Sequence, residues 1–232
     1  MSGQMVTIDS RDGGQFEAYM AAPAGGKGPG LVILPEIYNS NHWVRAVADG
    51  YAEDGYVCIA PDIYWREAPG TYLDYTPEGQ EQGRAMGFAL DLDKSMADLG
   101  CCADWLRAQD NCTGKVGSVG FCLGGKLVYL GMARKGLGAG GGYYAVQLNN
   151  HYDEADNITG PLMLHFGSLD TRIPPDMLRD IHTHLDGKPN VTIHEYEGAD
   201  HGFNRFGYPP FHEECAHIAR ERTLAFLAKE LG

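Results

Sequence analysis

The sequence predicts an α/β fold in which helices flank a mostly parallel central sheet. Short, solidly apolar runs at 31–35 and 56–61 have the composition of buried parallel strands. Such runs alternate along the chain with segments of helical composition, which is the order of an α/β protein. The 232 residues, 44% of them hydrophobic, suffice for one sizeable core. We therefore expect a single domain over residues 1–232, without a linker, an internal repeat or a separate cap domain.

The expected strands begin with an N-terminal pair. Segments 4–9 and 15–21 alternate between polar and apolar residues around a turn with two glycines, which predicts an antiparallel hairpin. The glycine-rich stretch 24–30 is interpreted as a loop. The stretch 136–142 is interpreted as a turn leading into a strand, because it lacks the preceding strand of a phosphate-binding loop. The remaining strands are expected at 31–35, 56–61, 115–121, 141–148, 161–167 and 191–197.

The expected helices lie between these strands. One helix ends at Gly55, where glycine is a common stop signal. An aromatic loop over 63–77 is followed by a long region of helical composition, which a break near Leu90 and Asp91 divides in two. The helices are expected over residues 42–54, 77–90, 91–109, 122–135, 175–185 and 213–231.

The charge of the chain argues against two classes of partner. The formal net charge is −13 and the sequence pI is about 5.0. Such a surface repels phosphate backbones and anionic lipid, so we expect neither nucleic-acid nor membrane binding. The same field opposes anionic substrates at long range, and an anion site would need its own local cations.

Three features of the sequence indicate a cytoplasmic protein. Its first residues lack the basic and apolar segments of a signal peptide. No apolar run approaches the roughly 20 residues of a membrane-spanning helix. The six cysteines are irregularly spaced, which indicates free thiols in a reducing compartment.

The stretch VGFCLGG, residues 119–125, follows an apolar strand and precedes a helical segment. This is the setting of a nucleophile elbow, a sharp strand-to-helix turn that presents a reactive side chain at its apex. Gly120 and Gly124 flank Cys122 where larger side chains would crowd the turn. The alternative is that Cys122 is a small buried thiol, because free cysteine is often buried.

An acid and a base follow in the order that such a nucleophile requires. Asp170 comes directly after the strand at 161–167, and His201 comes after the strand at 191–197. Both fall past the carboxyl ends of strands, where an open α/β sheet builds its site. Asp170 alone could be a turn former and His201 alone a solvated loop residue. Because three residues fit together in order and context, we predict a Cys-His-Asp triad.

Six stretches extend this pattern to nearly the whole chain: LPEIYN, APDIYWREAPGT, VGFCLGGK, GYYAV, HFGSLD and GADHGFNR. With them the sequence resembles the dienelactone hydrolase family of α/β-hydrolases. The resemblance implies the α/β-hydrolase fold. It also implies hydrolysis of a small, carboxylate-bearing lactone or ester through a thioester on Cys122, with no cofactor. The partner is then a small-molecule substrate, and we expect a monomer or small homo-oligomer.

The resemblance also implies residues around the triad. Glu36 would lie beside the thiol, and the backbone N–H groups of Ile37 and Leu123 would form the oxyanion hole. A carboxylate near the sulfur favours the neutral thiol, so Glu36 could protect Cys122 until substrate displaces it. Arg205 would bind the substrate carboxylate with its planar fork. The plain alternatives are a structural acid for Glu36 and a surface arginine for Arg205.

The chain departs from the family at a second substrate-binding arginine. The stretch PEGQEQGRAMGF is one residue shorter than the family pattern and has Gln80 at the matching place, with Arg84 one helical turn later. Either Arg84 substitutes or the acid group is bound differently. Tyr144 and Phe203 are candidates for the wall of the substrate pocket, and the alternative is that they belong to the core.

Other functions remain open at this point. A broader carboxylesterase or thioesterase could use the same triad, and a binding protein could have kept the fold. A redox thiol protein would need a resolving cysteine, for which only Cys112 could approach Cys122 in space. No metal site is expected. The spacing of the candidate ligands does not complete a set of four. These candidates are His182, His184, His212, Cys215 and His217.

Overall fold

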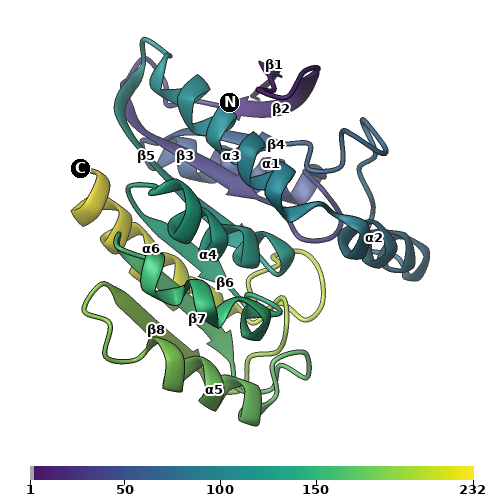
Figure 1. The fold of residues 1–232 in the computed structure, drawn as a ribbon, viewed down its shortest axis with the longest axis vertical. Helices are drawn as coiled ribbons and strands as arrows, with labels where there is room; N and C mark the ends of the chain where they lie inside the picture. Colours follow the sequence, from purple (N-terminus) through teal and green to yellow (C-terminus); the bar gives the residue numbers. More distant parts are fainter. Residues whose placement is uncertain (1–2) are drawn as a thin grey trace. The chain divides into compact units, whose positions relative to one another are not determined.

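The structure is a computed structural model that describes residues 3–232, and it has the predicted α/β architecture (Figure 1). The strands are β1 (Gln4–Asp9), β2 (Gln15–Ala21), β3 (Gly28–Leu34), β4 (Val57–Pro61), β5 (Cys112–Phe121), β6 (Gly140–Tyr143), β7 (Leu162–Gly167) and β8 (Val191–Tyr196). They are hydrogen-bonded in the order β1-β2-β4-β3-β5-β6-β7-β8. The pairs β1–β2 and β2–β4 are antiparallel, whereas β3–β4, β6–β7 and β7–β8 are parallel.

The helices alternate with these strands. They are α1 (His42–Glu53), α2 (Pro77–Ala89), α3 (Leu92–Arg107), α4 (Leu123–Lys135), the 3-10 helix η1 (Leu148–Asn157), α5 (Pro175–Leu185) and α6 (Glu213–Leu231). The chain divides into two compact units, the first ending at Ser118 and the second beginning at Val119, within β5. None of the helices that residues 3–232 form is long and apolar enough to cross a membrane.

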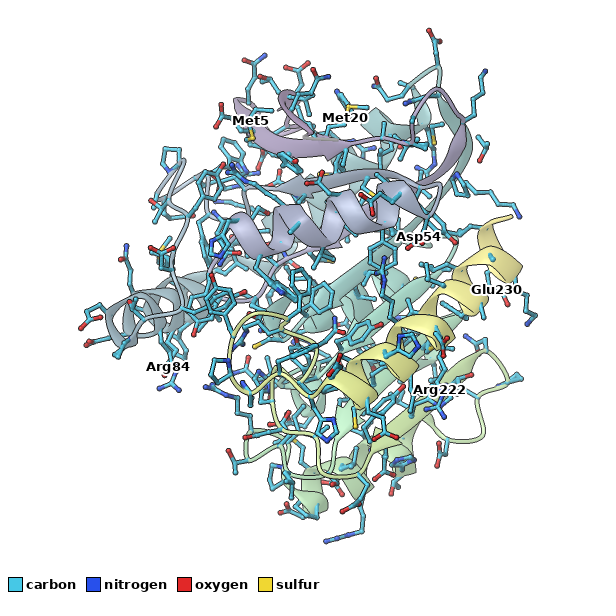
Figure 2. All side chains as sticks on the ribbon, turned by 180° about the vertical axis from the view of Figure 1, so that it is seen from behind. Met5, Met20, Asp54, Arg84, Arg222 and Glu230 are labelled. Carbon is cyan, nitrogen blue, oxygen red and sulfur yellow. The ribbon has the colours of Figure 1, made fainter. Side chains whose placement is uncertain are left out.

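In the first unit, α1 and α3 cover opposite faces of the strands (Figures 1 and 2). This explains why β3 is apolar throughout: all seven of its residues are buried. The helix α1 begins where the Asn41 side chain accepts hydrogen bonds from the N–H groups of Trp43 and Val44.

In the second unit, α4 and α6 cover opposite faces of the strands (Figures 1 and 2). A buried histidine joins α6 to β7 and β8. His165 Nδ1 lies 2.8 Å from the Tyr196 hydroxyl, and its Nε2 lies 3.0 Å from Thr223 Oγ1. Burial first, and then the charges of His194 and Arg222, keep the pKa of His165 well below its usual value. A neutral imidazole therefore fastens α6 to the sheet.

The fold confirms the predicted order of strands and helices and corrects two predictions. Residues 28–30, interpreted as part of a loop, begin β3, because Gly28 and Gly30 are packed too closely for a side chain. The strand expected over 141–148 ends at Tyr143, because Tyr144 and Gln147 have positive φ angles of 38° and 58°. These left-handed conformations turn the chain out of the sheet. The 3-10 helix η1 then begins at Leu148, the last residue of the expected strand, and continues through residues 149–157, for which no element was predicted.

Candidate active site

Cys122 is the single residue between β5 and α4. Its backbone has φ 54° and ψ −111°, a conformation that is strained for a residue with a side chain. The strain is held by backbone contacts, since the Cys122 N–H donates to the Tyr143 carbonyl at 2.9 Å. Leu123 follows as the first residue of α4, where backbone N–H groups have no partner within the helix.

The glycines around Cys122 are required by close packing. A Cβ atom at Gly120 would lie 2.2 Å from the Gly124 carbonyl oxygen, and one at Gly125 would lie 2.9 Å from Ala145 Cα. Strand, helix and the segment after β6 therefore approach more closely than any side chain would allow. This fulfils the steric expectation for the stretch VGFCLGG.

Asp170 and His201 lie in contact in the second unit. His201 Nδ1 is 2.8 Å from Asp170 Oδ2, and the two residues are 8% and 3% exposed. The other carboxylate oxygen of Asp170 accepts a hydrogen bond from the Arg172 N–H at 2.8 Å. The carboxylate is thus fixed in position and orients the imidazole through Nδ1.

The loops that carry these two residues are tied to each other. A Cβ at Gly167, the last residue of β7, would lie 2.3 Å from the Ala199 carbonyl oxygen. The same carbonyl accepts the Leu169 N–H at 2.9 Å. This close approach explains how residues 31 positions apart meet, because the parallel strands β7 and β8 end side by side.

The electrostatics of His201 reflect both neighbours. Burial lowers the pKa of His201. The charge of Cys122, the hydrogen bonds that His201 makes with Asp170 and Cys122, and the charge of Asp170 outweigh burial and raise this pKa to about 9. Because Nδ1 faces Asp170, Nε2 is the nitrogen left for the Cys122 sulfur. His201 therefore interacts with both Cys122 and Asp170, and the catalytic roles of the three residues stay predictions.

The two aromatic candidates lie beside this chain of contacts. The Tyr144 ring meets the His201 ring edge-on, with centroids 4.9 Å apart. Phe203 packs against Tyr144 at 5.7 Å and Tyr196 at 5.1 Å, and both Phe203 and Tyr144 are fully buried. The structure thus places both residues in the packing behind the histidine, and contact with a substrate stays a prediction for each.

Arg205 lies next to the catalytic-histidine candidate. Its guanidinium Nη2 would be only 2.9 Å from a Cβ at Gly202, the residue after His201. Gly202 has φ 87°, so glycine is required there both by the backbone and by the space that Arg205 fills. The side chain of Arg205 is partly exposed. Its Nη1 donates to the Pro209 carbonyl at 3.4 Å, and contact with a substrate stays a prediction.

Glu36 and Ile37 lie in the first unit, in the turn after β3. Glu36 is 1% exposed, and its carbonyl accepts the Asn39 N–H at 3.2 Å. The Tyr64 hydroxyl donates to the Ile37 carbonyl at 3.1 Å. A Cβ at Gly83 of α2 would lie 2.6 Å from that carbonyl oxygen. The peptide of Ile37 is therefore held on two sides, and the roles of both residues toward Cys122 stay predictions.

Sequence reasoning missed what anchors this turn. Asn39 has φ 62° and is fully buried, and its amide donates to Asp62 Oδ1 at 2.6 Å and to the Thr71 carbonyl at 2.9 Å. Asp62 also accepts the N–H groups of Tyr64 and Gly70 at 3.0 and 2.7 Å. The only signal in the sequence is that asparagine tolerates the left-handed conformation.

Arg84 is exposed, and Figure 2 shows its side chain extending outward from α2. Gln80, one turn earlier, instead reaches the Tyr38 hydroxyl at 3.4 Å. Among residues 3–232, no group of three or more histidine, cysteine or acidic side chains is arranged to hold a metal ion.

Comparison with known proteins shows the family to which the chain belongs. Residues 16–231 match the sequence model of the dienelactone hydrolase family. A carboxymethylenebutenolidase of Pseudomonas putida is 34% identical, over 96% of this chain and 95% of the relative. Carboxymethylenebutenolidase 1 of Cupriavidus pinatubonensis has the same identity and the same two coverages.

Solved structures share the fold. A Klebsiella pneumoniae protein provisionally assigned as a dienelactone hydrolase has a TM-score of 0.82 and 27% identity, with 97% of this chain and 99% of that chain covered. An esterase of Pyrococcus furiosus has a TM-score of 0.71 and 18% identity, and the match covers 99% of this chain and 93% of the esterase chain. At this identity the similarity shows a shared fold alone. The α/β-hydrolase fold implied by the resemblance is therefore confirmed.

Proposed function

Because the chain belongs to the dienelactone hydrolase family, we propose that it hydrolyses small lactones or esters with Cys122 as nucleophile, His201 as base and Asp170 as orienting acid. The chain is a carboxylic ester hydrolase of this family. One observation supports the roles proposed for the three residues. His201 is joined to Asp170 at 2.8 Å through Nδ1 and is hydrogen-bonded to the Cys122 side chain.

In the proposed reaction, the Cys122 sulfur attacks the ester carbonyl carbon while His201 holds the thiol proton. The backbone N–H groups of Leu123 and Ile37 stabilise the oxyanion, and such donors are typically worth about 3 kcal/mol each. Collapse of the tetrahedral intermediate breaks the C–O bond, and His201 gives its proton to the leaving oxygen. Water, deprotonated by His201, then cleaves the thioester, releasing the acid and restoring the thiol.

Glu36 is proposed to keep the resting thiol neutral. A buried carboxylate near a sulfur disfavours the thiolate. A substrate anion that displaced Glu36 would remove this effect and let the thiol proton pass to His201. We expect Glu36→Gln to speed alkylation of Cys122 at pH 6–7 by several-fold in the absence of substrate. Equal alkylation rates of wild type and Glu36→Gln across this range would exclude the switch.

Arg205 is proposed to bind the carboxylate of an anionic substrate. The relatives named carboxymethylenebutenolidase support a dienelactone-like substrate. We expect Arg205→Ala to lower kcat/KM for a dienelactone by about 10–100-fold and for p-nitrophenyl acetate by less than about threefold. The control is Arg179→Ala, which removes an exposed arginine of α5. It should change kcat/KM for neither substrate.

The decisive experiment is hydrolysis of a dienelactone and of neutral p-nitrophenyl esters and thioesters, with Cys122→Ala as the blank. Loss of all turnover in Cys122→Ala supports the proposed nucleophile, and retained turnover would falsify it. If Arg205→Ala impairs neutral and anionic substrates equally, the broader carboxylesterase or thioesterase is the better description. We place the reaction in the cytoplasm, with a small-molecule substrate and neither nucleic acid nor membrane as partner.

A further inference from the structure

A buried lysine stands out in the first turns of α4. Residues 123–132 of this helix are all buried, and nine of the ten are apolar, glycine or tyrosine. The tenth is Lys126, which is 5% exposed. Lysine is almost never buried to this degree unless a partner compensates its charge.

Lys126 lies one helical turn after the nucleophile candidate. Its backbone N–H donates to the Cys122 carbonyl at 3.2 Å. The Cα–Cβ bonds of a helix are tilted toward its N-terminus. The base of the Lys126 side chain is therefore tilted toward the end of α4 that Cys122 caps.

The partner that holds Lys126 in place is uncharged. Its Nζ donates to Gln147 Oε1 at 2.9 Å, and across residues 3–232 no other hydrogen bond and no carboxylate within ion-pairing distance is formed by this ammonium. Gln147 itself has φ 58° and directly follows Val146, whose N–H points to the Cys122 carbonyl at 3.4 Å. One amide thus fixes the ammonium near the elbow without neutralising it.

The pKa of Lys126 reflects both its burial and its neighbour. Burial lowers this pKa, and the charge of Cys122 acts in the opposite direction. An electrostatic interaction between two groups is reciprocal, so a charged sulfur and the Lys126 ammonium stabilise each other.

We propose that Lys126 is a positioning residue that stabilises Cys122 as the thiolate, so that His201 is not the only cation supporting the nucleophile. The inference deepens the proposed function and rests on Cys122 being its nucleophile. In the second unit, the titratable groups bearing on the sulfur are His201, with Asp170 behind it and Tyr144 against its ring, and Lys126. Glu36, as proposed above, acts in the opposite sense.

The test is the pH profile of Cys122 alkylation by iodoacetamide, read on the Cys122 peptide by mass spectrometry because the chain has six cysteines. Only the thiolate reacts, so the midpoint reports its ionisation. We expect Lys126→Met to raise the midpoint by about one pH unit and to slow alkylation at pH 7 by about tenfold. Lys126→Arg keeps the charge, so its midpoint should stay within a few tenths of a unit of wild type.

Lys126→Gln provides a second neutral variant, because its amide can still bond to Gln147 if the apolar variant fails to fold. The proposal is overturned if the neutral variants keep the wild-type midpoint, or if Lys126→Arg shifts it as much as they do. Alkylation does not require ester hydrolysis. An unshifted midpoint beside an inactive Cys122→Ala therefore refutes the lysine's role alone, whereas an active Cys122→Ala refutes the proposed function.

Discussion

His201 is held from two sides, by Asp170 at Nδ1 and by the side chain of Cys122. Burial opposes the charged imidazole, yet the two neighbours raise the pKa of His201 to about 9, compared with about 6.5 for a free histidine. A group whose pKa is raised in the folded state contributes stability that is complete below its unfolded pKa. That contribution is lost as pH rises through the folded pKa.

Asp170→Asn should therefore lower the free energy of unfolding more at pH 6 than at pH 10. The imidazolium that Asp170 stabilises is present at pH 6 and largely absent at pH 10, so the two losses should differ by about 2 kcal/mol. Urea denaturation at both pH values measures the difference. Asp180→Asn on exposed α5 is the control, and equal losses at both pH values for Asp170→Asn would contradict the assignment.

The elbow between β5 and α4 depends on packing between whole elements. At Gly120 an added Cβ meets backbone atoms of α4, which cannot move away as a flexible side chain can. Gly136, the C-cap of the same helix, has φ 59° and nothing within 4 Å of a Cβ. Gly120, in β5, therefore tests crowding against α4, whereas Gly136, at the end of α4, tests backbone strain alone.

Gly120→Ala should destabilise the protein by about 2–3 kcal/mol, because strand and helix must separate to admit the methyl group. Gly136→Ala should lower the free energy of unfolding by about 1 kcal/mol, because alanine is strained in the left-handed backbone conformation. Only Gly120→Ala should also change the alkylation rate of Cys122. Thermal unfolding measures the stability of each variant, and iodoacetamide labelling measures the alkylation rate of Cys122. A larger loss of stability in Gly136→Ala than in Gly120→Ala would disprove the crowding argument.

The elements show which parts of the fold sequence patterns reveal. Solidly apolar strands and the glycines around Cys122 predicted the sheet and the elbow, because local composition determines both. The early end of β6 was not predicted, since the left-handed backbones of Tyr144 and Gln147 arise from contacts with distant segments. Lys126 was missed for a related reason: on a helix, lysine suggests solvent exposure, and only the packing around α4 buries it.

At the scale of the whole molecule, the net charge of −13 opposes the approach of anions. Local cations such as Arg205 act only over short distances, because salt screens charges beyond about 8–10 Å at physiological ionic strength. Long-range repulsion and short-range attraction should therefore be separable by salt.

Raising the ionic strength from about 10 to 150 mM should increase kcat/KM for an anionic ester by about 2–5-fold, because screening weakens the long-range repulsion first. A neutral ester of similar size should change little and serves as the control. Steady-state kinetics at several salt concentrations measure both. A fall in kcat/KM for the anionic ester would instead mean that local cations dominate its approach.

The three proposed catalytic residues all belong to the unit that begins at Val119, whereas Glu36 and Arg84 belong to the other. A gene fragment encoding residues 119–232 therefore contains the codons of the proposed nucleophile, base and acid together. Recombination between relatives within the earlier part of the gene would leave that trio undivided. Under the proposed roles, such recombination would exchange Glu36 and the oxyanion donor Ile37 while Cys122, His201 and Asp170 stay together.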